Sequence, residues 1–317
     1  SLKPLIPDEN YSVLSPIFAK YYSKALDSIG SFYYTKESFD ETYPGYGSSY
    51  PDVQGAIAIL FEQGSSRGHL QETNYGTISF GFTIRNQYLS SIATVEAAID
   101  NKNLLRDYQK RFFSSSVTEF SSDKTKAYEF GDLYDMNRNK AFIDKLILHN
   151  IKVYRNKEKF IVPVKQQQSR MVKNFFETYD KYVDSVFYDA SAWSVSNFYN
   201  MKSKKLRSFI SESEITDTDN LIKNLKVNKS DYAYIIDWND YNSPAALNHL
   251  QKNDIVTYSA FKPFKIKVDN ANKGVQFNYG SILVPVSKQK ISSDKLYEII
   301  KELQSKFNVP IYNSESG

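Results

Sequence analysis

The fold of this chain is decided by the stretch Ala127-Tyr128-Glu129-Phe130, which has a counterpart later in the sequence, Ala233-Tyr234-Ile235-Ile236. Both runs are short and rich in apolar residues, as buried strands are. A polar turn and a helical pattern follow each run. A second apolar run comes next, Ile161-Val162-Pro163-Val164 in the first copy and Leu283-Val284-Pro285-Val286 in the second. The sequence therefore predicts an internal repeat.

The remaining elements match in kind between the two copies. Helices are expected over residues 141–150, 170–176 and 245–252, and from the N-cap Ser292 or Ser293 onward; strands are expected over 151–154, 255–258 and 309–312. Strands and helices that alternate at this spacing are typical of a mostly parallel sheet covered by helices on both faces. The sequence thus predicts an α/β fold.

The N-terminal region opens with a helical pattern from Leu14 to Ile29, in which apolar residues recur on one helix face. A turn-rich stretch over residues 43–51 follows. Residues 56–61 then form a continuous apolar run, as in a strand buried on both faces. This run ends at Glu62, before a glycine-rich loop. A carboxylate at the end of a buried strand is a common way to place a catalytic group in α/β proteins.

A second helix is expected at about residues 86–107, and a polar, serine-rich segment over 114–126 follows it. We interpret this segment as a domain boundary, because polar stretches between periodic segments are typical of linkers. The predicted domains are therefore residues 1–120 and residues 121–317.

The composition excludes several classes of protein. A hydrophobic fraction of 41% and a charged fraction of 24% indicate a globular chain, and no stretch reaches the ~18 apolar residues of a membrane helix. The net charge of +4 is too small to indicate nucleic-acid binding. With no Cys, the chain has no thiol nucleophile and no Cys-ligated metal. A three-histidine site would need His69, His149 and His249 together.

The run Tyr43-Pro44-Gly45-Tyr46-Gly47-Ser48-Ser49-Tyr50-Pro51, followed by Leu60-Phe61-Glu62-Gln63, resembles the C-terminal part of bacterial zinc metallocarboxypeptidases of the carboxypeptidase A-like family. The preceding Tyr33-Tyr34-Thr35-Lys36-Glu37 is also similar to that family. Farther on, Ile161-Val162-Pro163-Val164 and Asp184-Ser185-Val186-Phe187-Tyr188-Asp189-Ala190-Ser191-Ala192-Trp193 resemble a C-terminal domain appended to some of these proteins. That domain has a class I glutamine amidotransferase-like fold, so the resemblance implies a mostly parallel, flavodoxin/amidotransferase-like α/β domain after a carboxypeptidase-like part.

The resemblance also implies site residues. In the family, an apolar strand delivers the glutamate that acts as general base on a zinc-bound water, and Glu62 stands at the matching place. Tyr46 or Tyr50 would match the family's mobile phenol that closes over the substrate, and the spacing leaves both open. The implied activity of the full-length protein is hydrolysis of C-terminal peptide bonds in a peptide substrate. A periplasmic or secreted location is implied in the same way.

The chain departs from the family at the metal site. The family's zinc is held by a His-x-x-Glu pair and a later His, all far upstream of the general base, and no His precedes Glu62 here. We therefore expect a chain truncated within the peptidase domain, with zinc in the full-length protein and none in this chain. His69-Leu70-Gln71-Glu72 has the pair's spacing but follows Glu62 in a polar loop, so it predicts no metal site.

Two functional interpretations remain open. The first is the C-terminal portion of a zinc carboxypeptidase-like protein that is inactive by itself. The second is a non-catalytic binding or structural module whose peptidase site has decayed. For residues 121–317, the lack of Cys excludes amidotransferase chemistry, so an accessory role is expected, either packing on the peptidase part or offering a docking surface. The sequence does not indicate the oligomeric state.

Overall fold

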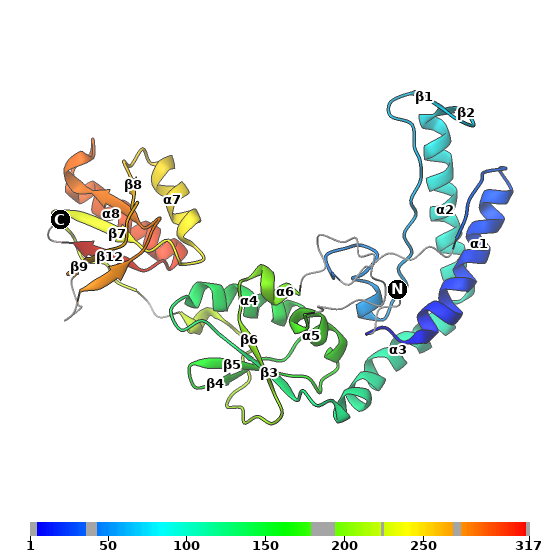
Figure 1. Ribbon diagram of the computed structural model, residues 1–317, viewed down its shortest axis with the longest axis horizontal. Coiled ribbons are helices and arrows are strands. Elements are labelled where there is room, and N and C mark those ends of the chain that lie inside the picture. Colours follow the sequence, from blue (N-terminus) through cyan, green and yellow to red (C-terminus); the bar gives the residue numbers. More distant parts are fainter. Residues whose placement is uncertain (1–4, 36–42, 179–193, 223–224, 269–273, 315–317) are drawn as a thin grey trace. The chain divides into compact units, whose positions relative to one another are not determined.

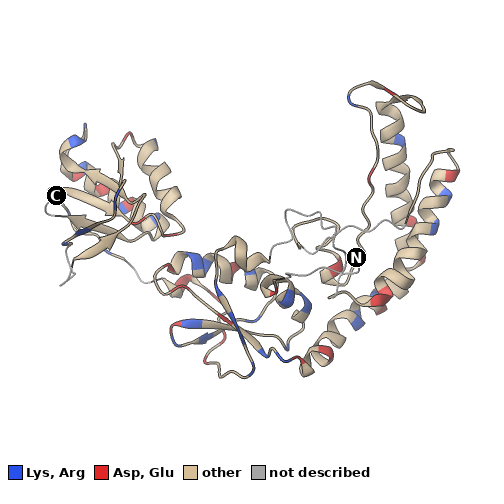
Figure 2. Cartoon of the chain, viewed as in Figure 1, with Lys and Arg blue, Asp and Glu red and all other residues tan. Residues whose placement is uncertain are grey.

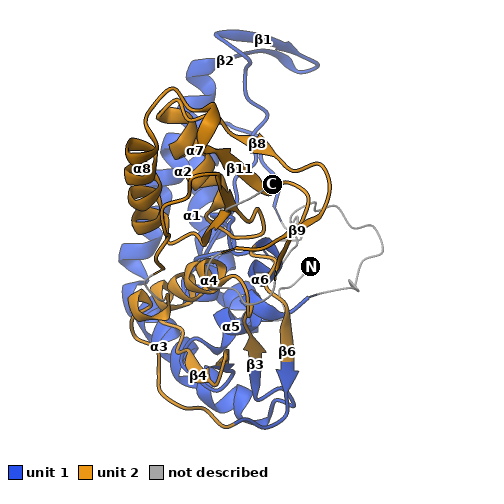
Figure 3. Cartoon of the chain, turned by 90° about the vertical axis from the view of Figure 1, so that its left-hand side faces the viewer, with its two compact units in different colours: residues 1–128, 162–198, 205–209 blue, residues 129–161, 199–204, 210–317 orange. Residues whose placement is uncertain are grey.

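The computed structural model describes residues 5–35, 43–178, 194–222, 225–268 and 274–314. Residues 184–193, which contribute to the family resemblance, lie outside the described residues, as do Lys36 and Glu37. The chain divides into two compact units (Figure 3). One unit comprises residues 1–128, 162–198 and 205–209, and the other comprises residues 129–161, 199–204 and 210–317.

The N-terminal region is mainly helical (Figure 1). Its elements in chain order are the π-helix η1 (Asn10–Leu14), α1 (Ser15–Asp27), the 3₁₀ turn η2 (Asp52–Gln54), β1 (Leu70–Thr73), β2 (Gly76–Ser79), α2 (Phe80–Asp100), α3 (Lys102–Glu119) and the 3₁₀ turn η3 (Phe120–Ser122). The helix predicted from Leu14 to Ile29 is confirmed as α1. The second predicted helix is instead a pair, α2 and α3, which meet at Asn101.

The strand predicted over residues 56–61 is wrong. These residues belong to no strand, and the two-stranded antiparallel sheet of this region is the β1–β2 hairpin further along the chain. An isolated apolar segment gains the hydrogen bonds of a strand only when a neighbouring strand pairs with it. In the described part of the chain, no strand takes that place beside residues 56–61.

Helices α1 and α2 pack together through a small core. Phe18 and Tyr22 of α1 lie against Ala93 and Ala97 of α2. Small residues on one helix let the aromatic rings of the other approach its backbone closely. The side chain of Ser79 caps the start of α2 by accepting a hydrogen bond from the backbone N–H of Phe82, which fixes where the helix begins.

The polar segment at residues 114–126 is helical as far as Glu119. Its polar groups make specific contacts with α5 (Ser169–Phe176) and the turn before it. The hydroxyl of Ser116, which is fully buried, donates to the carbonyl oxygen of Gln167 at 2.8 Å. The guanidinium of Arg170 is also buried, and it binds the Phe112 carbonyl oxygen and the Glu119 carboxylate.

The predicted internal repeat is confirmed by the topology of two four-stranded sheets. The first copy consists of β3 (Ala127–Phe130), α4 (Met136–Leu148), β4 (Tyr154–Asn156), β5 (Lys159–Pro163), α5 and β6 (Ser203–Leu206), with α6 (Val195–Phe198) between α5 and β6. The second consists of β7 (Ala233–Ile236), α7 (Ser243–Lys252), β8 (Tyr258–Ser259), β11 (Ile282–Pro285), α8 (Ser293–Phe307) and β12 (Ile311–Ser314). The 3₁₀ turns η4 (Asp219–Leu221) and η5 (Val286–Lys288) complete this part of the chain.

Each copy has the element order β-α-β-β-α-β. The strand orders are β4-β5-β3-β6 and β12-β7-β11-β8, so corresponding strands take corresponding places in the two sheets. If the strands of each copy are numbered by sequence, both orders read 4-1-3-2. This is the split β-α-β arrangement of ferredoxin-like folds.

The prediction of a mostly parallel, flavodoxin/amidotransferase-like sheet is therefore wrong. All three pairings of the second sheet, β12 with β7, β7 with β11 and β11 with β8, are antiparallel. In the first copy, β4 pairs with β5 in the same antiparallel way. The cause is that the middle two strands of each copy follow each other without a helix between them. The broader prediction of a mixed α/β chain is confirmed.

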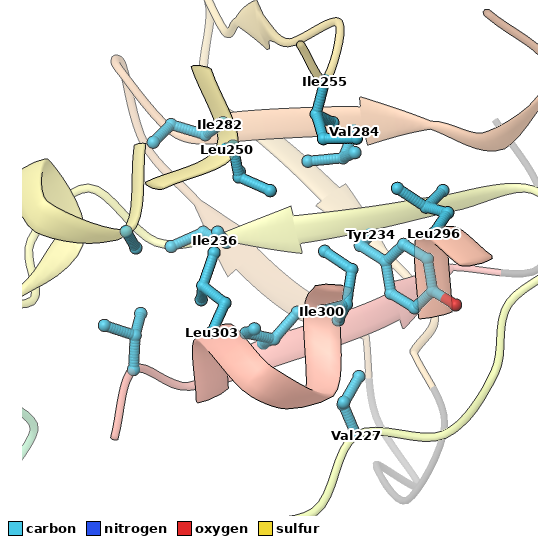
Figure 4. Packing of buried hydrophobic residues seen from close by; sticks show 13 residues of the cluster. Val227, Tyr234, Ile236, Leu250, Ile255, Ile282, Val284, Leu296, Ile300 and Leu303 are labelled. Carbon is cyan, nitrogen blue, oxygen red and sulfur yellow. The ribbon is translucent and has the colours of Figure 1, made fainter. Parts of the chain in front are cut away.

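The core of the second copy lies between its sheet and its two helices (Figure 4). Leu250 of α7 and Leu296, Ile300 and Leu303 of α8 pack onto Ile236 and its neighbours in the sheet. The opposite face of the sheet is covered by the hairpin of β9 (Phe264–Ile266) and β10 (Val275–Phe277), through a cluster that includes Phe277 and Ile235. This hairpin is an insertion between β8 and β11.

Candidate functional site

Glu62 lies on the surface of the first unit, in the extended segment between η2 and β1. Its side chain forms no hydrogen bond or ion pair with any residue that the structure describes. The neighbouring Phe61 meets the ring of Tyr22 edge-on at 4.7 Å, and Gln63 accepts a hydrogen bond from Gln87. The residues on both sides of Glu62 are thus attached to α1 and α2, whereas its carboxylate is exposed.

The start of this segment is held by a buried polar cluster. The amide of Asn10 donates to the carbonyl oxygen of Ala56 at 3.0 Å and to the carboxylate of Asp52 at 3.3 Å. Asp52 also accepts from the backbone N–H of Ala58 at 2.9 Å, and the Tyr108 hydroxyl lies 3.3 Å from the Asn10 amide. Burial raises the pKa of Tyr108, which keeps the phenol neutral. The cluster fixes the direction in which residues 56–62 leave η2.

The two candidate tyrosines lie in the turn before η2. The ring of Tyr46 is half-buried and packs edge-on against Tyr43 at 5.6 Å, while Tyr50 is 40% exposed. The carbonyl oxygen of Tyr46 accepts hydrogen bonds from the backbone amides of Ser49 and Tyr50, which closes the turn. Neither phenol is hydrogen-bonded to Glu62. The structure therefore does not bring the three predicted site residues into one hydrogen-bonded constellation.

The three histidines lie on different elements. His69 is exposed just before β1, and Glu72, at the matching spacing, accepts a hydrogen bond from the Thr77 hydroxyl. The Nδ1 atom of His149 lies 2.7 Å from the Lys145 carbonyl oxygen at the end of α4. His249 of α7 packs beside Phe307. Among the residues that the structure describes, no group of three or more His, Cys, Asp or Glu side chains could hold a metal ion, so these residues do not fit a zinc site.

Helix α2 has apolar residues on two opposite faces, a feature that our sequence analysis missed. On a helix of 3.6 residues per turn, the buried residues Asn86, Ser90, Ala93 and Ala97 form one face, and its two alanines pack against α1. The opposite face carries six large apolar side chains that are between 39% and 63% exposed: Phe80, Ile84, Tyr88, Ile92, Val95 and Ile99. Figure 2 shows that charged residues are sparse along this helix. We call these six residues the α2 apolar face.

Other exposed apolar residues belong to the same unit. Leu60 and Phe61 are 45% and 36% exposed, Leu70 at the start of β1 is 67% exposed, and Phe32 after α1 is fully exposed. Monomeric proteins rarely expose so many large apolar groups unless they form an interface. A sequence signal for the α2 apolar face existed, since its residues recur at spacings of 4, 4, 4, 3 and 4.

Comparisons with protein-family models, curated proteins and solved structures found no match. Among the described helices, none is both long enough and apolar enough to cross a bilayer.

Proposed function

We propose that residues 1–120 are the C-terminal part of a zinc carboxypeptidase-like domain, and that residues 121–317 are a non-catalytic accessory module. The observation that carries this proposal is the α2 apolar face. A helix with apolar residues on opposite faces belongs to the interior of a larger domain, where both faces are covered. In the described structure only the face toward α1 is covered.

The kind of surface that covers the α2 apolar face follows from its spacing. Left-handed coiled coils repeat every 3.5 residues, whereas the spacings of 4, 4, 4, 3 and 4 drift around the helix in the other direction. The α2 apolar face is therefore poorly matched to a left-handed pairing with a second copy of α2. A surface other than a second copy of α2 is therefore expected to cover this face.

In this arrangement Glu62 is the general base. Its carboxylate follows the apolar residues 56–61, and it is exposed on the same unit as the α2 apolar face. A carboxylate that is not tied up in an ion pair is free to accept a proton from a water molecule. Because the described residues do not fit a zinc site, the metal ligands of this proposal would come from polypeptide outside the described residues. The chain by itself is then expected to be inactive.

The test uses both this chain and the full-length protein of the parent gene. Cleavage of a C-terminal residue from a peptide should require the full-length protein, and Glu62→Gln should lower kcat by roughly 10²-fold or more, as loss of a general base does. Glu72→Gln is the matched control and should leave kcat unchanged. Metal analysis of the dialysed 317-residue chain should find no stoichiometric zinc.

Two outcomes would contradict the proposal. One is peptide hydrolysis or tight zinc binding by the 317-residue chain. The other is a full-length protein that cleaves peptides equally well with Glu62→Gln. A full-length protein that folds and lacks peptidase activity would instead favour the second interpretation, a binding module with a decayed site.

A further inference from the structure

The two copies of the repeat share a polar motif, Asp-x-x-Asp-x-Asn. It reads Asp132-Leu133-Tyr134-Asp135-Met136-Asn137 in the first copy and Asp237-Trp238-Asn239-Asp240-Tyr241-Asn242 in the second. Each motif follows the first strand of its copy and leads into the first helix. In each, the first Asp accepts a hydrogen bond from the backbone N–H two residues later, at 2.9 Å and 3.1 Å respectively. The two loops are therefore equivalent in sequence, place and local structure.

The equivalent loops bind each other. The side-chain amide of Asn137 donates to both carboxylate oxygens of Asp240, each at 2.9 Å. In the other direction, the backbone N–H of Tyr241 donates to Asp135 at 2.9 Å. Arg138 Nη2 adds a hydrogen bond of 3.1 Å to the carbonyl oxygen of Asn239. Each loop thus supplies both donors and acceptors to the other.

The end of α8 completes the junction. Asn137 also donates to the carbonyl oxygen of Asn308 at 3.0 Å, and Asn242 donates to that of Phe307 at 2.8 Å. The last residue of each motif therefore satisfies a carbonyl at the C-terminus of the same helix. These carbonyls would otherwise lack a partner within the helix. The loop–loop contact is consequently part of a larger polar network.

Carboxylates outnumber cations at this junction. Asp135 and Asp240 are only 4% and 8% exposed. Arg138 is the cation, and it pairs with Asp132 at 3.3 Å and Asp135 at 3.1 Å. The charged and titratable groups around Asp240 are Asp135 and Arg138 from the first copy, Asp237 on its own loop and Tyr312 on β12; α8 offers the carbonyls named above.

Burial is the largest influence on the pKa of both the Asp240 and the Asp135 carboxyl group, and it raises both. It raises the pKa of Asp240 to about 6, an effect that outweighs the hydrogen bonds from Asn242 and Asn137, and the charge of Asp135 adds to it. Burial also raises the pKa of Asp135, against the hydrogen bonds from Arg138 and Tyr241. When Oδ2 of Asp240 is protonated, Oδ1 still accepts from the Asn137 amide and from the backbone N–H of Asn242, so proton uptake removes a buried charge at the cost of one of these three hydrogen bonds.

We propose that the paired Asp-x-x-Asp-x-Asn loops form a proton-sensitive latch between the two copies of the repeat, which closes more tightly when Asp240 is protonated. The sign follows from linkage: a carboxyl with a raised pKa in the closed state favours closure below its ordinary pKa of 3.8 and loses that contribution as pH rises through about 6. A shift of about two units corresponds to roughly a 10²-fold change in the opening equilibrium.

The latch is tested by hydrogen exchange of the whole chain, followed by mass spectrometry on the peptide containing residues 237–243. The backbone amide of Tyr241 donates across the junction to the Asp135 carboxylate, so its protection reports closure, whereas the Asn242 amide donates to Asp240 on its own loop. After correction for intrinsic rates, protection should fall by roughly 50-fold between pH 4 and pH 8 and level off above about pH 7. A profile that does not change with pH would overturn the proposal.

Three variants separate a titrating latch from a purely structural contact. Asp240→Asn should stay closed at every pH, with protection at pH 8 equal to that of the original chain at pH 4. Asp237→Asn, on the same loop, should keep the pH dependence, whereas Asn137→Ala should lose protection at every pH. Retention of the full profile by Asp240→Asn would refute the latch. If that variant does not fold, carbon-13 titration of the Asp240 carboxyl decides: a pKa near 6 supports the latch, and one near 4 overturns it.

Discussion

The side chain of Arg170 contacts both the backbone carbonyl and the aromatic ring of Phe112. The Nη1 atom donates to the Phe112 carbonyl oxygen at 2.7 Å, and the guanidinium carbon lies 4.6 Å from the centre of the Phe112 ring. The side chain of Arg170 is only 3% exposed, and Glu119 is its ion-pair partner. A buried cation with a carbonyl, a carboxylate and an aromatic face around it joins α3 to α5.

Replacing this cation should destabilise the first unit. Arg170→Ala leaves a buried carbonyl without its donor and opens a cavity, so we expect the free energy of unfolding to fall by about 3 kcal/mol. Denaturant unfolding followed by circular dichroism measures the change. Arg111→Ala is the matched control, because Arg111 is 53% exposed in its ion pair with Glu9 and should contribute less than about 1 kcal/mol. Equal losses for both variants would show that burial of Arg170 is unimportant.

A second prediction concerns Gly55, which ends η2 with a φ of 72°. A Cβ atom there would lie 2.9 Å from Cδ1 of Phe112. Gly55→Ala combines a left-handed backbone with this clash, so we expect a loss of about 2 kcal/mol in unfolding free energy. Gly47→Ala, eight residues earlier, has open space at its Cβ position and no left-handed φ, and should be nearly neutral. The comparison fails if thermal unfolding shifts equally for both.

The α2 apolar face should tolerate charge in the isolated chain. Ile84→Glu and Ile99→Glu replace residues that are 52% and 62% exposed, so each should change the unfolding free energy by less than about 1 kcal/mol while reducing binding of an apolar fluorescent dye. Ala93→Glu places the same charge on the buried face, at a residue 3% exposed, and should cost more than about 3 kcal/mol. A large loss of stability from Ile84→Glu would mean that this face is already covered.

The fourth prediction concerns acid stability of the first unit. Burial disfavours the ionised form of Glu177, but hydrogen bonds from Lys205 and Tyr128 and the charge of Lys173 outweigh it, so its pKa lies below the usual 4.5. A lowered pKa stabilises the folded state above pH 4.5, and this contribution is lost as pH falls through the lowered value. Glu177→Gln should therefore flatten the decline of stability below about pH 4.5, as followed by urea unfolding at several pH values. The exposed Glu158→Gln should leave the decline unchanged.

The sequence was sufficient to find the repeat but not the direction of its strands. The order strand, helix, strand, strand, helix was visible, and two strands joined without a helix form a hairpin in most folds. Lys157, with a φ of 56°, makes the tight turn between β4 and β5. That short connection forces an antiparallel pair, because a parallel pair needs a crossover of a dozen residues or more. The alternation of helices and strands alone therefore led to the wrong prediction of a mostly parallel sheet.

The candidate site shows a second kind of feature that the sequence alone does not predict. Residues 56–61 have the composition of a buried strand, yet a strand also requires a partner, and composition carries no information on whether one is present. The six residues of the α2 apolar face recur at helical spacing and could have been recognised. They were missed because periodicity identifies an apolar face and leaves open whether another element covers it. The contact between Asn137 and Asp240 was equally hidden, since it joins residues far apart in the chain.

The β9–β10 hairpin has a practical consequence for work on this chain. In the second copy, the hairpin lies in the connection between β8 and β11. In the first copy, the matching connection between β4 and β5 is a tight turn at Lys157 and Glu158. The second copy thus contains an extra segment at this point and keeps the same strand order as the first copy. A peptide tag or a fluorescent reporter placed between Lys157 and Glu158 should accordingly be accepted without loss of either sheet, giving an internal attachment point away from both termini.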